Sequence, residues 1–223
     1  MTQETWTSVD NYINGLFVPS DDALDAALKA SSEAGLPNIQ VAPNQGKLIS
    51  ILAQSIGARK ILEVGTLGGY STIWLARALP ADGKLISLEI DPKHAEVARA
   101  NVARAGLADK VDIRLGKAID NLPKIVAEGL GPFDLVFIVA DKPSNTEYFE
   151  WALKMTHKGS LIITDNVIRN GGVADPNSTD DSVRGVRRFN ARIAPEKRVT
   201  TTEIQTVGSK GYDGLAISLV ISD

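Results

Sequence analysis

Short runs of apolar residues alternate with longer segments of helical periodicity through the middle of the chain. The apolar runs are rich in β-branched residues and cover 60–64, 84–89, 111–115, 133–139 and 160–165. Segments with apolar residues at helical spacing lie between them, at 70–78, 92–105, 118–128 and 145–154. Repeated strand–helix–strand units of this kind predict a parallel sheet that is covered by helices on both faces.

The pattern changes on either side of this central region. Three helical segments precede the first strand, at 5–17, 21–34 and 43–54. After residue 165 come a polar loop, a helical segment at 182–193, and two strands at 199–205 and 214–221. The glycine-rich connection between the last two strands predicts an antiparallel pair. We therefore expect one α/β domain over 1–223, with an N-terminal helical cap (1–55) and a Rossmann-like core (56–223). Its sheet should be doubly wound, seven-stranded and mostly parallel, with an antiparallel last strand.

Two of the expected helices carry start signals. Asp91 can cap a helix that has Pro92 at its first position, and Ser144 stands three residues before Glu147, which is capping-box spacing.

Composition and charge narrow the classes of function. The chain has 223 residues, 43% hydrophobic and 23% charged, as in a soluble globular protein. A formal net charge of −3 does not indicate the basic surface that binds nucleic acid or anionic lipid, so we expect neither nucleic acid nor a membrane as a partner. No apolar run approaches the roughly 20 residues of a membrane span, and the first ten residues do not resemble a signal peptide. The absence of cysteine excludes disulfides and thiol catalysis, and the expected location is cytoplasmic.

The segment 61–71 is the most informative part of the chain. An apolar run ends in Glu63 and enters a turn with glycines at Gly65, Gly68 and Gly69, after which a helical pattern begins. Such a joint lets backbone approach a nucleotide-like ligand closely, but the glycine spacing is not that of dinucleotide-binding proteins. A carboxylate before the turn disfavours a pyrophosphate and suits a cationic amino-acid group. S-adenosylmethionine (SAM), which has an ammonium and a sulfonium, is such a ligand.

Further polar residues stand at the ends of the other expected strands. Glu89 ends the second strand, about 20 residues after the glycine turn, where an acid can accept hydrogen bonds from both ribose hydroxyls of NAD or SAM. Asp141 and Lys142 follow the fourth strand, and Asp165 and Asn166 end the fifth. Because ligands of such sheets bind outside the carboxyl ends of the strands, these side chains should meet at one site.

In these residues the chain resembles the class I SAM-dependent methyltransferases, specifically the cation-dependent O-methyltransferases of the caffeoyl-CoA and catechol type. The resemblance runs from about residue 41 to 220 and is carried by the segments 63–71, 140–142, 164–167 and 205–208. It implies a small phenolic, catechol-type acceptor and a homodimer. It implies that Lys142 is the catalytic base and that Asn170 touches substrate. The SAM pocket that it implies is lined by Val41, Glu63, Gly65, Thr66, Ser71, Glu89, Ala118 and Asp141.

The chain departs from the family pattern at the expected metal site. In the family an Asp at the end of the fourth strand and an Asp-Asn pair at the end of the fifth hold a divalent cation, usually Mg²⁺. Asp165 and Asn166 supply the pair, but Val139 stands in place of the first aspartate. Mg²⁺ prefers six oxygen ligands, so we expect its binding to be weakened. Asp141, two residues further on, could swing in as a substitute.

Several other residues have simpler interpretations. His94 and His157 have no second ligand at metal-binding spacing and are expected at the surface. Arg184, Arg187, Arg188 and Arg192 have helical spacing and are expected on a solvated helix face. An N-terminal helix with Trp6, Tyr12 and Phe17 on one face either covers the substrate, contacts a dimer partner or packs in the core.

Three hypotheses follow. The chain is an O-methyltransferase with weakened metal dependence, or a SAM-binding relative impaired by natural drift or by an engineered Val139, or an NAD-dependent oxidoreductase. The third needs a phosphate-cradling glycine motif and tolerates Glu63 poorly.

Overall fold

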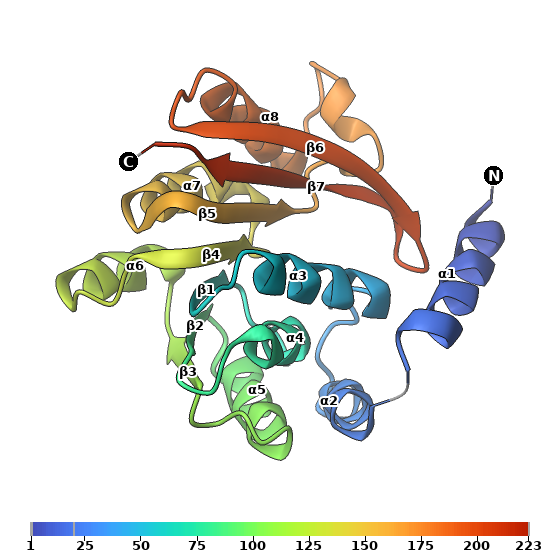
Figure 1. The fold of residues 1–223 in the computed structure, drawn as a ribbon. Helices are drawn as coiled ribbons and strands as arrows, with labels where there is room; N and C mark the ends of the chain where they lie inside the picture. Colours follow the sequence, from blue (N-terminus) through green and yellow to red (C-terminus); the bar gives the residue numbers. More distant parts are fainter. Residues whose placement is uncertain (1, 20, 223) are drawn as a thin grey trace.

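Seven strands form one mixed sheet in the order β3-β2-β1-β4-β5-β7-β6 in the computed structural model, which describes residues 2–19 and 21–222 (Figure 1). The strands are β1 Lys60–Val64, β2 Lys84–Glu89, β3 Val111–Leu115, β4 Phe133–Ile138, β5 Thr156–Asp165, β6 Val199–Gly208 and β7 Gly211–Val220. The five strands β1 to β5 are parallel, whereas β7 is antiparallel to both β5 and β6. The predicted sheet, including its antiparallel last strand, is confirmed.

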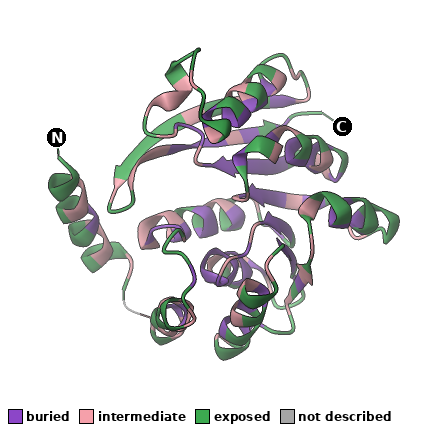
Figure 2. Ribbon diagram, turned by 180° about the vertical axis from the view of Figure 1, so that it is seen from behind, coloured by how far each residue is buried: buried purple, intermediate pink, exposed green. Residues whose placement is uncertain are grey.

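Helices cover both faces of this sheet. They are α1 Gln3–Phe17, α2 Asp22–Glu33, α3 Pro43–Ser55, α4 Tyr70–Ala78, α5 Pro92–Arg104, α6 Ala118–Ala127, α7 Asn145–Lys154 and α8 Asp181–Ile193, with short 3-10 turns η1 Lys142–Ser144 and η2 Gly172–Ala174. Ile61 packs with residues of α3, α4 and α5, while the next residue, Leu62, packs with residues of α6, α7 and α8. Because neighbouring strand residues point to opposite faces, the apolar runs fill two cores, and the strands at the centre are buried (Figure 2). Each fully buried aliphatic side chain contributes roughly 1.5–3 kcal/mol.

The turn after β1 needs a glycine because the backbone that follows β4 passes close to it. Gly65 has φ +103°, and a Cβ there would lie 3.0 Å from the backbone nitrogen of Ala140, which follows β4. Gly69, with φ +81°, begins α4. The ends of β1 and β4 therefore come together where the ligand site was predicted.

The two predicted helix starts have different outcomes. The Asp91 carboxylate accepts from the backbone N–H groups of Lys93 and His94, so the predicted cap of α5 is confirmed. The predicted capping box is wrong, because Ser144 begins α7 without a side-chain capping bond. Asp141 instead accepts from the Ser144 N–H and caps the preceding turn η1.

The first helix stands apart from the two cores. Of the predicted face of α1, Tyr12 and Phe17 are 69% and 61% exposed and Trp6 is half-buried, so most of this face does not pack in the core. Figure 1 shows α1 beside the tip of the β6–β7 hairpin, where the buried Asp10 carboxylate accepts from Ser209 N–H at 2.7 Å. No helix within the described ranges is long and apolar enough to cross a bilayer.

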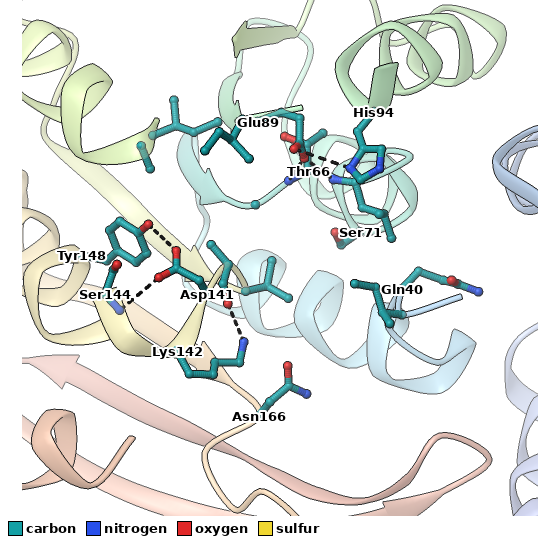
Figure 3. Close-up of a pocket in the computed structure, with 18 of the residues that line it drawn as sticks. Gln40, Thr66, Ser71, Glu89, His94, Asp141, Lys142, Ser144, Tyr148 and Asn166 are labelled. Atoms are coloured by element: carbon teal, nitrogen blue, oxygen red, sulfur yellow. Dashed lines mark hydrogen bonds and ion pairs between the residues drawn. The ribbon is translucent and has the colours of Figure 1, made fainter. Parts of the chain in front are cut away.

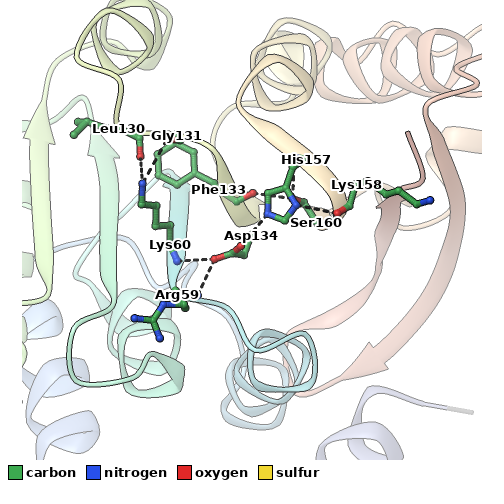
Figure 4. Close-up of polar contacts among 9 residues, drawn as sticks. All are labelled: Arg59, Lys60, Leu130, Gly131, Phe133, Asp134, His157, Lys158 and Ser160. Carbon is green, nitrogen blue, oxygen red and sulfur yellow. Dashed lines mark hydrogen bonds and ion pairs between the residues drawn. The ribbon is translucent and has the colours of Figure 1, made fainter. Parts of the chain in front are cut away.

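A polar network ties the strands together at the edge of the sheet opposite the glycine turn (Figure 4). The Asp134 carboxylate accepts from the backbone N–H groups of Arg59 and Lys60, each at 2.8 Å. Its other oxygen lies 2.9 Å from His157 Nε2. His157 is part of β5, which starts earlier than predicted, and its side chain is partly exposed. Burial opposes ionisation of Asp134, but these hydrogen bonds outweigh it and lower its pKa.

Candidate functional site

A cavity of about 1030 Å³, here called the large cavity, opens at the carboxyl ends of β1, β2 and β4 (Figure 3). Seven of the eight residues predicted to bind the cofactor line it: Val41, Gly65, Thr66, Ser71, Glu89, Ala118 and Asp141. They come from segments distant in the sequence, which the parallel sheet brings to one edge. The cavity is roomy enough for a nucleoside-sized ligand.

The Glu89 side chain, at the end of β2, forms hydrogen bonds with the backbone of the glycine turn. One of its carboxylate oxygens accepts from the backbone N–H groups of Thr66 and Leu67 at 3.2 and 2.7 Å. The other accepts from Asp91 N–H at 2.9 Å and lies 3.7 Å from His94 Nδ1. Each carboxylate oxygen has two lone pairs, so the second oxygen can still accept from a ligand hydroxyl.

Glu63, predicted to line the cofactor pocket, is fully buried behind the large cavity and is not among its lining residues. Its carboxylate accepts from the hydroxyls of Ser71, Thr72 and Ser87 at 2.5–2.6 Å. Burial raises its pKa to about 7, although the three hydroxyls act in the opposite direction. Of these hydroxyl groups, only that of Ser71 belongs to a lining residue, so Glu63 positions the cavity wall rather than forming it.

Hydrogen bonds hold the Asp141 side chain in place on one wall of the large cavity. Its carboxylate accepts from Tyr148 Oη at 2.6 Å and from Ser144 N–H at 3.2 Å (Figure 3). Burial and the bond to Asp141 raise the pKa of Tyr148. The hypothesis that Asp141 replaces the missing metal ligand gains no support from this geometry, because Tyr148 and Ser144 hold its carboxylate on the wall of the large cavity, which Asp165 does not line.

A second cavity of about 630 Å³, here called the small cavity, adjoins the first. Its wall includes Asp165 and Asn170, both predicted site residues, together with Asp10 of α1. The residues that line both cavities are Ile39, Gln40, Val41, Asn166 and Arg169. A cofactor in one cavity and an acceptor in the other would therefore meet at this shared wall.

Lys142, the predicted base, lines the large cavity and points towards Asn166 (Figure 3). Only 7% of the residue is exposed, and its ammonium donates to the Ala140 carbonyl at 2.7 Å. Burial lowers the pKa of Lys142, while the charge of Asp165 opposes this shift. A lysine with a lowered pKa is more readily neutral and so better able to accept a proton.

The residues at the predicted metal position do not fit a firmly held divalent cation. The buried Asp165 accepts through one oxygen from Gln45 Nε2 at 3.0 Å and from Asn166 N–H at 2.8 Å, and burial raises its pKa to about 6. Val139, which lines the large cavity, has no oxygen in its side chain. Among residues 2–19 and 21–222 no three His, Cys, Asp or Glu side chains are grouped to hold a metal. One carboxylate and one amide are few ligands for Mg²⁺.

Two interpretations of the remaining charged residues differ in outcome. His94, predicted at the surface, is partly exposed and lines the large cavity beside Glu89 (Figure 3). The helix cap at Asp91 was the available signal, since it places the first turn of α5 at the ligand edge. The arginines of α8 do not form an anion site: Arg187 and Arg188 donate to backbone carbonyls, and Arg192 pairs with glutamates.

Sequence reasoning missed Gln45, Arg169 and Asp10 on the small cavity. Arg169 follows the Asp-Asn pair by only three residues, so its closeness in sequence was a usable signal. Asp10 had none, because its position depends on how α1 contacts the β6–β7 hairpin.

Comparison with known proteins places the chain among methyl-transferring enzymes. A model of the O-methyltransferase family matches residues 19–219. The chain is 56% identical over 220 residues to a catechol O-methyltransferase of Niastella koreensis, a match spanning 99% of this chain and 100% of the relative. It is similar to an O-methyltransferase of Bacillus cereus solved in complex with S-adenosylhomocysteine (SAH), with a TM-score of 0.97, 51% identity and coverage of 98% and 100%. It is also similar to a Streptomyces achromogenes O-methyltransferase involved in tomaymycin synthesis, solved with SAM, with a TM-score of 0.96, 49% identity and full coverage of both chains.

Proposed function

The chain belongs to the O-methyltransferase family and is SAM-dependent, and on that premise we propose that it methylates a hydroxyl of a small, catechol-type phenol. The observation that carries the proposal is the pair of adjoining cavities next to a buried lysine. SAM occupies the large cavity in this proposal, and the phenol occupies the small one.

The proposed cofactor contacts follow from the wall of the large cavity. Glu89 accepts from the ribose hydroxyls through its second oxygen. Ser71 and the backbone at Gly65 face the methionine part, and Glu63 keeps Ser71 in place through their 2.6 Å hydrogen bond.

Lys142 acts as the base in the proposed reaction. Neutral Lys142 takes the proton of the phenol hydroxyl, and the oxygen then forms a bond to the SAM methyl carbon. The electron pair of the broken carbon–sulfur bond stays on sulfur, so the sulfonium becomes a neutral thioether. The shared wall aligns the two reactants for this in-line displacement. Alignment alone can lower the activation free energy by several kcal/mol.

Asp165 and Asn166 are the residues that would hold a divalent cation, and we propose that they hold it only weakly. A bound cation would lower the pKa of the hydroxyl and fix both catechol oxygens. Val139 supplies no metal ligand, and the Asp141 carboxylate is hydrogen-bonded to Tyr148. In the proposed reaction the protein's own side chains therefore deprotonate and orient the hydroxyl.

We further propose that α1 contributes to the acceptor side or to a homodimer contact rather than to the core. Its apolar residues Tyr12, Leu16 and Phe17 are exposed, while Asp10 reaches the small cavity. Asn170, on the wall of the same cavity, is a proposed substrate contact.

The test is turnover of a panel of catechols with SAM, followed by mass spectrometry, with Mg²⁺ and with EDTA. A singly methylated product, with activity only partly sensitive to EDTA, is expected. The alternative of a SAM-binding but catalytically impaired protein predicts calorimetric SAM binding without product from any acceptor. An NAD-dependent oxidoreductase is excluded by the family to which the chain belongs.

A further inference from the structure

Arg169 lies on the wall that the two cavities share, in a backbone conformation that few residues adopt. Its φ is +55°, in the left-handed region. The Asp213 carboxylate holds this conformation by accepting from the N–H groups of Ile168 and Arg169 at 2.9 and 3.0 Å. The loop after Asn166 is therefore anchored to β7, and the arginine has a defined position.

Only part of the hydrogen-bonding capacity of the Arg169 guanidinium is used by other protein groups. One terminal nitrogen lies 3.6 Å from Asp213 Oδ2, which is an ion pair at long range. The Nε atom is buried and has no hydrogen-bond partner within residues 2–19 and 21–222. A buried donor without an acceptor costs about 1–3 kcal/mol, and a ligand oxygen or a water that accepted from the guanidinium would relieve this cost.

The charges around Arg169 show what this acceptor can be. Arg169 pairs with the acid Asp213, and the base Lys142 interacts electrostatically with Arg169 and with the acids Asp141, Asp165 and Asp213. Arg169 also acts to lower the pKa of Lys142, so its charge reaches the proposed base. Arginine stays protonated at any pH at which the enzyme works, and its planar donors suit an anionic oxygen.

We propose that Arg169 is a catalytic residue that binds the ionising oxygen of the acceptor and supplies the positive charge that a firmly held metal ion would otherwise bring. The inference rests on the proposed phenolic acceptor. The hydroxyl proton passes to neutral Lys142, the resulting phenolate is held by the guanidinium, and its oxygen then takes the methyl group as sulfur keeps the carbon–sulfur electron pair. Arg169 gains and loses no proton in these steps.

The proposal can be tested without turnover by using 4-nitrocatechol, whose ionised form absorbs visible light. The probe is titrated with pH in the ternary complex with SAH, once with EDTA and once without it. Arg169→Gln removes the charge, Arg169→Lys keeps it, and Arg184→Gln is the matched control, because Arg184 is exposed and pairs with Asp181. Calorimetric SAH binding checks that each variant is folded.

In the wild-type complex the pKa of the bound probe should lie below that of the free probe. Arg169→Gln should raise the bound value by about one unit, which is tenfold weaker binding of the ionised form. Arg169→Lys should fall between the two, and Arg184→Gln should match the wild type.

Three results would overturn the proposal. An unchanged bound pKa in Arg169→Gln removes the role of Arg169 and leaves the proposed function intact. A wild-type shift that exists only when EDTA is omitted assigns the charge to a metal ion. Failure of the folded wild type to bind the probe removes both this proposal and the proposed acceptor class.

Discussion

Val139→Asp should strengthen the divalent-cation site that Asp165 and Asn166 are proposed to hold only weakly. Val139 lines the large cavity at the end of β4, one position beyond the residue that pairs with Thr164 of β5. A carboxylate there would join Asp165 and Asn166. Valine and aspartate are similar in size, so the change should cost little in packing.

Without a metal ion the variant should be less stable than the wild type at neutral pH. Burial already raises the pKa of Asp165 to about 6, and a second acid nearby adds like-charge repulsion. Mg²⁺ should reverse this loss, because an ion that binds only the folded state stabilises it by about 2.7 kcal/mol at a concentration of 100 Kd. For a chain of this length that corresponds to a rise in Tm of roughly 5–11 °C.

The assay is thermal unfolding over a range of Mg²⁺ concentrations, with Val139→Asn as the control of equal shape without charge. The wild type should respond weakly, the Asn variant slightly more, and the Asp variant strongly. An equally large Mg²⁺ response in the wild type would show that its existing residues already complete a site, and the reasoning about Val139 would be wrong.

Three more perturbations test other parts of the structure. Glu89→Gln should weaken SAM binding by about tenfold or more, as expected for losing a charged hydrogen-bond acceptor, and unchanged calorimetric affinity would refute the ribose role. Deleting residues 1–17 should raise the acceptor KM and leave SAM affinity near the wild-type value; a folded truncation with normal KM would limit α1 to other contacts. Asp134→Ala should cost about 1 kcal/mol at pH 7, because it removes charged hydrogen bonds to the exposed N–H groups of Arg59 and Lys60, which water can then solvate. Because the folded-state pKa of Asp134 lies below the ordinary aspartate value of 3.8, this difference should be present above about pH 4 and shrink as pH falls further. A pH-independent difference in chemical denaturation would contradict the ionic role.

The sheet was predictable because its strands carry strong local signals. The bounds of β1, β2 and β3 match the prediction, since each is a short apolar run between polar turns. The start of β5 was missed because His157, Lys158 and Gly159 are typical of a turn, whereas Thr156 pairs with Phe133 across an irregular register. Pairing of this kind is set by the neighbouring strand and leaves no local pattern.

The candidate site was predictable at the strand ends and less so elsewhere. The position of Glu89 follows from the sheet, because the ends of parallel strands share an edge. The burial of Glu63 depends on three hydroxyls, two of them on α4 and one on β2, that meet only in the folded chain. The contact between Asp10 and the β6–β7 hairpin joins residues about 200 positions apart, which no local pattern reports.

The central claim is that Lys142 accepts the proton of a phenol in the chemical step. The most direct test is the rate of methyl transfer from SAM to a catechol, with and without EDTA, in the wild type and in Lys142→Met. We predict that the wild type keeps activity in EDTA and that the variant loses about 10²-fold or more in kcat, with SAM affinity unchanged. A wild type that is inactive in EDTA, or a variant that keeps its kcat, would contradict the account.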